Sequence, residues 1–168
     1  MLKYSDDFNK YLSSFKINSC EKIPIYASIS DTENTEHNKL KTQISLLFIK
    51  GDNQYTIYIE NFQTFEGNFS DKNRNKGYGS LLLNKLTDRM SELGLLPSIT
   101  EIKGSLEAKD KAYWQISMPM YLKFARGIFG CEPICTIADE SINLETFSQA
   151  MQIIKRFCSC AIFSFKKP

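Results

Sequence analysis

The chain has 168 residues, of which 42% are hydrophobic and 24% charged, and its formal net charge at pH 7 is +2. This length and composition predict a single globular domain over residues 1–168, and the small net charge disfavours binding to nucleic acid over a broad basic surface. No apolar run approaches the ~20 residues of a membrane helix, and the amino terminus lacks the apolar core of a secretion signal, so we expect a cytoplasmic protein with no membrane partner.

The first forty residues predict a helix, a strand and a polar loop. Residues 7–17 place apolar side chains at helical spacing, and residues 23–29 have the composition of a strand. Residues 30–41 are almost wholly polar and predict a solvated loop that holds the only histidine, His37. A single histidine in such a loop argues against Ser-His or Cys-His catalysis.

A β-hairpin is predicted next. Residues 44–50 and 54–62 are rich in β-branched and aromatic side chains and are joined by Gly51-Asp52-Asn53, a sequence typical of a turn. The second strand of this hairpin leads toward the most informative part of the chain.

Glu60 lies near the end of that strand and is a candidate general base. The alternation of a strand would place it on one face with Tyr58 and Phe62. A carboxylate partly desolvated between two aromatic rings has a raised pKa, which suits a base. A solvent-facing strand glutamate is the alternative.

The most informative stretch is residues 72–80, Lys-Asn-Arg-Asn-Lys-Gly-Tyr-Gly-Ser. Gly77 and Gly79 permit a tight turn in which several backbone N–H groups converge on one anion, and the helix predicted directly afterwards adds the positive end of its dipole. Three cationic side chains surround the turn although the chain as a whole is nearly neutral. The stretch predicts a phosphate-binding loop, with an ordinary glycine-rich helix cap as the alternative.

Two common nucleotide loops are excluded by the residues that follow. A Walker-type loop needs Lys and then Ser or Thr after its second glycine, but Ser80-Leu81 follow Gly79. A dinucleotide fingerprint needs a third small residue where Leu82 stands, and a short strand immediately before the glycines. What remains is Arg-x-x-Gly-x-Gly at the junction of a strand and a helix.

A helix, a strand and a second helix are predicted after the loop. Apolar residues at helical spacing form one face of the first helix, which ends at Gly94: Leu83, Leu86, Met90 and Leu93. Residues 99–106 predict a strand, and residues 110–129 predict an aromatic-rich helical region. Because a strand after a crossover helix normally runs parallel to the strand before it, residues 54–106 predict a βαβ unit with the loop at its carboxyl edge.

Beyond residue 130 we expect a strand at residues 131–138, a final strand at residues 161–165, and between them a helix marked by Leu144, Phe147, Met151 and Ile154. The five cysteines are expected to be reduced thiols. A zinc site built from Cys131, Cys135, Cys158 and Cys160 is the weaker alternative, because neither spacing is the usual two-residue gap, and no metal is expected.

The motif from Arg74 to Gly79, in this order of elements, resembles the coenzyme A pyrophosphate loop of the GNAT superfamily of acyl-CoA N-acyltransferases. Residues 119–124 resemble the family segment that carries an aromatic-tyrosine pair, and the resemblance covers about residues 42–130. Three segments depart from the family pattern: residues 66–73, 107–110 and 126–130.

The resemblance implies an α/β fold with a mixed, mostly antiparallel sheet and a βαβ coenzyme-binding unit. It also implies that backbone groups at the end of the second hairpin strand hold the thioester carbonyl and the pantetheine arm, and that the loop holds the diphosphate. The residues concerned are Gln63, Thr64, Phe65, Arg74, Asn75, Lys76, Gly77, Tyr78, Gly79 and Ser80. The resemblance gives Tyr121 the task of assisting the departing thiolate; core packing is the alternative, and Tyr113 takes its place if the register slips.

The resulting hypothesis is an N-acetyltransferase that transfers an acetyl or other short acyl group from acetyl-CoA to a primary amine by direct attack in a ternary complex. A catalytically inactive acyl-CoA-binding regulatory module is the alternative. Nucleic-acid binding through residues 72–76 is a third reading, with only three cations to support it. The acceptor, small molecule or protein, stays open, as does the choice between a monomer and a homodimer.

Overall fold

The structure is a computed structural model that describes residues 1–16, 21–33, 39–64, 77–107, 114–138, 140–142, 152 and 160–168. The first elements are β1 (Leu2–Asp6), α1 (Phe8–Lys16), β2 (Lys22–Asp31), β3 (Lys39–Lys50) and β4 (Tyr55–Thr64). They are followed by α2 (Tyr78–Glu92), a short 3-10 helix (Leu96–Ser98), β5 (Ile99–Glu107), α3 (Trp114–Phe129), β6 (Ile134–Ile137), β7 (Glu140–Ile142) and β8 (Cys160–Lys166).

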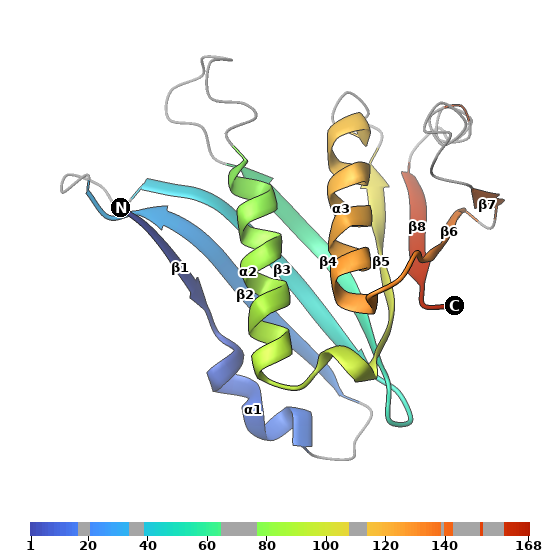
Figure 1. Cartoon of the computed structure of the whole chain (residues 1–168), viewed down its shortest axis with the longest axis horizontal. Helices are drawn as coiled ribbons and strands as arrows, with labels where there is room; N and C mark the ends of the chain where they lie inside the picture. The colour runs from blue at the N-terminus through green and yellow to red at the C-terminus, as the bar shows by residue number, and fades with distance from the viewer. Residues whose placement is uncertain are drawn as a thin grey trace.

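The strands form one eight-stranded sheet in the order β1-β2-β3-β4-β5-β8-β6-β7. Neighbouring strands are antiparallel except β4 and β5, which run parallel and are connected through α2. Helices α1, α2 and α3 lie on one face of the sheet (Figure 1). The predicted fold class, a mixed and mostly antiparallel sheet with one βαβ unit, is confirmed.

The prediction from sequence did not include strands β1 and β7, and it made one loop too long. β1 is an edge strand of mostly exposed residues, and β7 has only three residues. The loop expected at residues 30–41 is shorter, because Ser30 pairs with Leu40 and Asp31 with Lys39 as β2 and β3 continue their ladder. Backbone pairing extends these strands through polar residues that composition assigns to a loop. The helix expected around residues 144–154 and the loop residue His37 lie outside the described residues.

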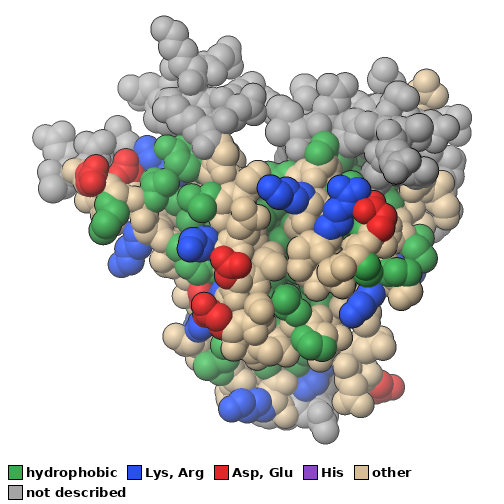
Figure 2. All heavy atoms as spheres, in the orientation of Figure 1, with side chains coloured by type: hydrophobic (Ala, Val, Ile, Leu, Met, Phe, Trp, Pro, Cys, Tyr) green, Lys and Arg blue, Asp and Glu red, His purple; other side chains and the backbone are tan. Residues whose placement is uncertain are grey.

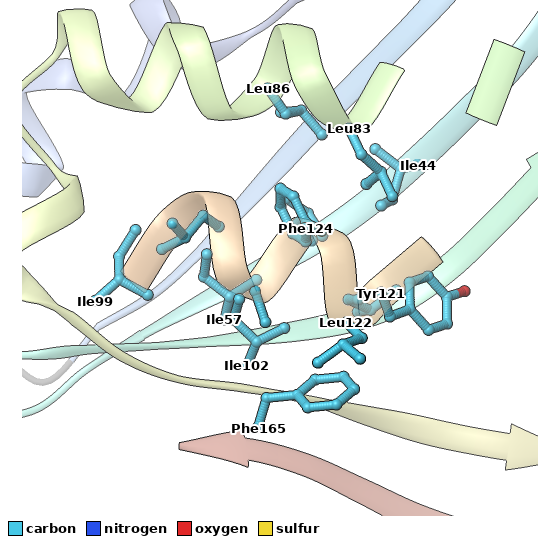
Figure 3. Close-up of a cluster of buried hydrophobic side chains, with 14 of the residues drawn as sticks. Ile44, Ile57, Leu83, Leu86, Ile99, Ile102, Tyr121, Leu122, Phe124 and Phe165 are labelled. Atoms are coloured by element: carbon cyan, nitrogen blue, oxygen red, sulfur yellow. The ribbon is translucent and has the colours of Figure 1, made fainter. Parts of the chain in front are cut away.

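The core lies between the helices and the sheet. Leu83, Leu86 and Met90 of the predicted apolar face of α2 are buried, and Leu93 is partly buried against them. The buried side chains of α3 meet those of the central strands in the same layer (Figure 3). Removing these side chains from water is what fixes α2 and α3 against the sheet. None of the helices in the described ranges combines the length and the apolar character that crossing a membrane requires.

Candidate active site

The parallel strands β4 and β5 part before they end. Their ladder runs from Tyr55 opposite Ile99 to Ile59 opposite Gly104, and no rung joins residues 60–64 of β4 to residues 105–107 of β5. Each strand keeps its other neighbour, because β4 stays paired with β3 and β5 stays paired with β8 to their ends. We call the opening between residues 60–64 and 105–107 the fork. Along it, β4 presents an edge of backbone groups that an extended ligand can pair with.

A β-bulge at Glu60 marks the point where the fork begins. Ile59 lies opposite Leu46 and Asn61 lies opposite Ser45, so Glu60 is an extra residue on β4. An extra residue shifts the alternation by one position, which turns Phe62 toward the helices, where it lies beside Tyr121. Tyr58, between the buried Ile57 and Ile59, faces the opposite side of the sheet.

The prediction that Glu60 shares one face with Tyr58 and Phe62 is therefore wrong, and the bulge is the physical reason. Glu60 is exposed and is not desolvated between the two rings. It does lie where the fork begins, on the strand edge that the two parted strands leave open. Its position, and not a buried environment, is what makes it a candidate base.

The amino end of α2 faces the same region. Gly77 precedes the helix with φ 76°, a left-handed conformation that glycine adopts without steric cost. The first intrahelical hydrogen bond runs from the Leu81 N–H to the Gly77 carbonyl, 2.9 Å, so the N–H groups of Tyr78, Gly79 and Ser80 precede the helix's own ladder. No described side chain caps them. These donors and the positive end of the helix dipole suit an anion.

Gly79 has a packing task that the sequence did not indicate. A Cβ at this position would lie 2.9 Å from Cζ of Phe62 and 3.0 Å from Sδ of Met120. The missing Cβ therefore lets the first turn of α2 rest directly on β4 and α3. The expected loop residues Phe65, Arg74, Asn75 and Lys76 lie outside the described residues, as does the segment proposed for nucleic acid, residues 72–76.

Tyr121 is buried, with 8% of its surface exposed, and it stacks on Phe163 of β8 with ring centroids 5.3 Å apart and planes at 11°. The ring of Phe62 lies nearly perpendicular to it, with centroids 6.0 Å apart and planes at 81°. In Figure 3 its hydroxyl points away from the aliphatic cluster that includes Leu122 and Ile57. Tyr121 thus belongs to the core through its ring while its polar end points out of it, so packing and a chemical role are compatible. Tyr113 lies outside the described residues.

Gly104 makes this aromatic arrangement possible at the point where the strands part. A Cβ there would lie 2.9 Å from Cε1 and Cζ of Phe163 and 3.2 Å from the Ile59 carbonyl oxygen. The ring of Phe163 consequently lies over the last rung between β4 and β5. We call Phe62, Met120, Tyr121 and Phe163 the fork cluster.

Two expected backbone contributors, Gln63 and Thr64, lie at the end of β4 and are exposed. The Gln63 carbonyl accepts a hydrogen bond from the Thr42 hydroxyl of β3, 3.0 Å, and its side chain accepts one from Gln43, 3.0 Å. These bonds hold the end of β4 against β3 and away from β5. They keep the fork open beside residues 63–64.

Lys41 is a residue near the site that the sequence analysis missed. Its Nζ lies 6.0 Å from the ring centroid of Tyr78, the first residue of α2, and 3.9 Å from Oδ2 of Asp31. It therefore brings a cation from β3 to the amino end of α2. The sequence analysis placed it in the loop expected at residues 30–41, whereas in the structure it belongs to β3.

Other groups in the described ranges offer weaker sites. A surface hollow of about 350 Å³ lies at the opposite end of β4, and its lining includes Lys16, Lys50 and Tyr55 but no carboxylate or thiol. Cys131 is exposed, and burial raises the pKa of the Cys135 thiol to about 12. No cluster of metal-ligating side chains occurs among the residues that the structure describes. Figure 2 shows basic and acidic side chains interspersed over the helix-covered face.

Comparison with protein-family models finds no match, and comparison with curated protein sequences finds none either. Solved structures do match. NAA60 of Arabidopsis thaliana in complex with acetyl-CoA matches with a TM-score of 0.50 and 10% identity, over 98% of this chain and 97% of that one. A chain of the NatC complex bound to Gag peptide and CoA matches with a TM-score of 0.50 and 11% identity, over 99% of this chain and 98% of that one.

NAA60 in complex with a bisubstrate analogue matches equally well, with a TM-score of 0.50 and 10% identity over 98% of this chain and 96% of the other. These proteins are GNAT-family acetyltransferases, and the present chain has the GNAT fold. The similarity of fold that the glycine loop and the element order implied is thereby confirmed. Because only about one residue in ten is identical, these comparisons show a shared fold and no more.

Proposed function

We propose that this chain is an acyl-CoA-dependent N-acyltransferase that transfers an acetyl group from acetyl-CoA to a primary amine. The observation that carries the proposal is the coincidence of three features at one place: the fork between β4 and β5, the uncapped amino end of α2, and the hydroxyl end of Tyr121. The crystallised complexes of NAA60 with acetyl-CoA and of NatC with CoA, which have the same fold, support this reading.

The coenzyme would bind through backbone groups. Its diphosphate accepts hydrogen bonds from the N–H groups of Tyr78, Gly79 and Ser80, with Arg74, Asn75, Lys76 and Gly77 completing the loop. Its pantetheine amides pair with the free edge of β4 along residues 60–64, as an added strand does. A backbone N–H near Gln63, Thr64 and Phe65 donates to the thioester oxygen as negative charge develops there.

The reaction is a displacement at the thioester carbonyl carbon. The amine nitrogen forms the new C–N bond, the C–S bond breaks, and the electron pair of that bond leaves on sulfur. An alkylamine has a pKa near ~10.4 and is mostly protonated at pH 7, so a base must take its proton. Glu60, exposed where the fork begins, takes this proton directly or through water, and the Tyr121 hydroxyl donates to the departing thiolate.

The acceptor is a primary amine of a small molecule or of a protein. The exposed position of Glu60 leaves room for either, because the base lies at the surface of the fork and not in a closed pocket. Two solved structures with the same fold support an acceptor that is bound together with the coenzyme: NatC is bound to a peptide and CoA, and NAA60 to a bisubstrate analogue.

Two measurements test the proposal: calorimetric titration with acetyl-CoA, and free-thiol release in the presence of a mixed amine panel. We expect binding and amine-dependent thiol release, and we expect Tyr121→Phe and Glu60→Gln each to lower kcat by about 100-fold or more with smaller effects on coenzyme affinity. Tyr55→Phe is the matched control, since Tyr55 lies at the other end of β4.

The outcomes separate the hypotheses. Absence of coenzyme binding contradicts the proposal altogether. Coenzyme binding without thiol release for any amine, together with unchanged affinity in both variants, favours the alternative of an inactive acyl-CoA-binding regulatory module.

A further inference from the structure

The fork is closed on its helix side by side chains from three elements. Phe62 comes from β4, Met120 and Tyr121 come from α3, and Phe163 comes from β8. Tyr121 stacks on Phe163 with ring centroids 5.3 Å apart, and Phe62 makes a T-shaped contact with Tyr121 at 6.0 Å. These contacts join Phe62, Tyr121 and Phe163 into a wall along the side of the opening that faces α2 and α3, and Met120 lies next to Phe62 beside Gly79.

The wall is packed tightly, as the two glycines beside it demonstrate. At Gly79 even one added carbon would lie 2.9 Å from the ring of Phe62 and 3.0 Å from the sulfur of Met120, and at Gly104 it would lie 2.9 Å from the ring of Phe163. Real Cβ atoms do not approach other atoms so closely. The wall therefore has no room for an additional methyl group at either place unless a side chain moves.

From this packing we propose that Phe62 and Met120 restrict the acyl group of the donor to acetyl. The inference rests on the proposed function, because it concerns the acyl group carried by the same coenzyme. In that function the thioester sulfur lies beside Tyr121 and its oxygen lies beside the end of β4. Phe62 extends from β4 to Tyr121 and so lies between these two points, where an acyl chain longer than acetyl meets its ring first.

The two side chains limit the acyl group to different degrees. The ring of Phe62 is held between Tyr121 and the first turn of α2, so it cannot swing aside without disturbing one of them. Met120 is only partly buried and has a flexible, unbranched side chain that adapts to its surroundings. Phe62 is consequently the principal limit and Met120 the secondary one.

The test compares kcat/KM for acetyl-, propionyl- and butyryl-CoA with one amine acceptor. The wild-type chain is expected to prefer acetyl-CoA by about 10- to 200-fold for each added methylene. Phe62→Ala is expected to reduce the preference over butyryl-CoA by about 10-fold or more, and Met120→Ala by less. Phe15→Ala is the matched control: it removes another partly buried phenylalanine, beside Tyr55 at the far end of β4, and should leave the preference unchanged.

Calorimetry also gives the dissociation constant of each variant for the three acyl-CoAs. A variant that has lost turnover can therefore still be tested for its preference among acyl groups. Equal use of acetyl- and butyryl-CoA by the wild-type chain overturns the inference and leaves the proposed function standing. An unchanged preference in both Phe62→Ala and Met120→Ala, by rate and by affinity, also overturns it. Failure of the wild-type chain to bind any acyl-CoA contradicts the proposed function itself, and the inference with it.

Discussion

An aromatic cluster lies at each end of β4, and the two differ in what surrounds them. At the start of the strand, Phe8, Phe15, Phe48 and Tyr55 form what we call the hairpin-end cluster, with ring centroids 5.3 to 6.0 Å apart. The fork cluster lies near the other end, seven residues or about 23 Å further along the strand. The same kind of side chain thus packs where β4 is paired on both sides and, at the other end, where its pairing with β5 has ended.

The difference lies in the backbone and in the polar ends of the tyrosines. Around Tyr55 the ladders to β3 and β5 are both present, and the Tyr55 hydroxyl donates to the Phe15 carbonyl at 2.9 Å, so the polar atom is used inside the fold. Around Phe62 the ladder to β5 has ended. Aromatic packing at the hairpin end therefore lies inside an unbroken part of the sheet, whereas at the fork it lies beside strands that are no longer paired, where the proposed function places the coenzyme.

The largest contrast is expected from deleting one ring in each cluster. Phe48 and Phe163 are both almost fully buried, so Phe48→Ala and Phe163→Ala should each lower the free energy of unfolding by about 3–5 kcal/mol. Of these two variants, only Phe163→Ala should also weaken the binding of acetyl-CoA, because Phe163 packs against Tyr121 and Phe48 does not. Denaturant unfolding and calorimetry on the folded fraction measure the two effects. Equal losses of affinity in the two variants would remove the functional distinction between the clusters.

A second contrast compares two glycines in helices. Gly79→Ala pushes a Cβ into Phe62 and Met120 and should cost about 1–3 kcal/mol of stability. At Gly127 of α3 a Cβ would meet Thr87 at 3.5 Å, which is ordinary contact, so Gly127→Ala should stabilise the chain by up to about 1 kcal/mol through helix propensity. Thermal unfolding of both variants decides the matter. A stabilising Gly79→Ala would mean that the fork cluster is looser than its distances indicate.

Much of the fold could be predicted from local patterns in the sequence. The β3–β4 hairpin, α2 and β5 have strong periodicity and clear turn residues, and the parallel pairing of β4 with β5 follows from the crossover rule. β1 escaped prediction because it is a five-residue edge strand with only two apolar residues, Leu2 and Tyr4, which is too short a pattern to indicate a strand. Residues 39–41 were assigned to a loop because their composition is polar, although β2 pairs with Lys39 and Leu40 and so extends β3 through them.

The candidate site was predictable in part. Gly77 and the start of α2 could be located because the turn and the helix signal adjoin each other in the sequence. The face of Glu60 was mispredicted, because no residue type announces that a strand will bulge there. The tasks of Gly79 and Gly104 depend on partners distant in the sequence, such as Met120 and Phe163, and only the packed fold brings these together.

A third, smaller contrast concerns the Tyr55 hydroxyl. Tyr55→Phe removes the hydrogen bond to the Phe15 carbonyl and should lower the free energy of unfolding by about 1 kcal/mol. Phe15→Ala, which keeps the carbonyl but removes the ring, should cost more, because it takes away aromatic contacts with both Phe48 and Tyr55. Urea unfolding of the two variants measures the difference. An unchanged midpoint in Tyr55→Phe would mean that water replaces the lost donor without cost.

The smallest effect is expected at alkaline pH. Burial raises the pKa of Tyr55 above its ordinary value near ~10, because the charged phenolate is disfavoured inside the hairpin-end cluster. Below pH ~10 both the folded and the unfolded chain keep this proton, so its contribution to stability is fully present. As pH rises further, the unfolded chain releases the proton first, and the stability of the fold declines until the folded state titrates as well. Urea midpoints should therefore decline less steeply above pH ~10 in Tyr55→Phe than in the wild-type chain. An equally steep decline in Tyr55→Phe and in the wild-type chain would show that the decline does not arise from burial at Tyr55.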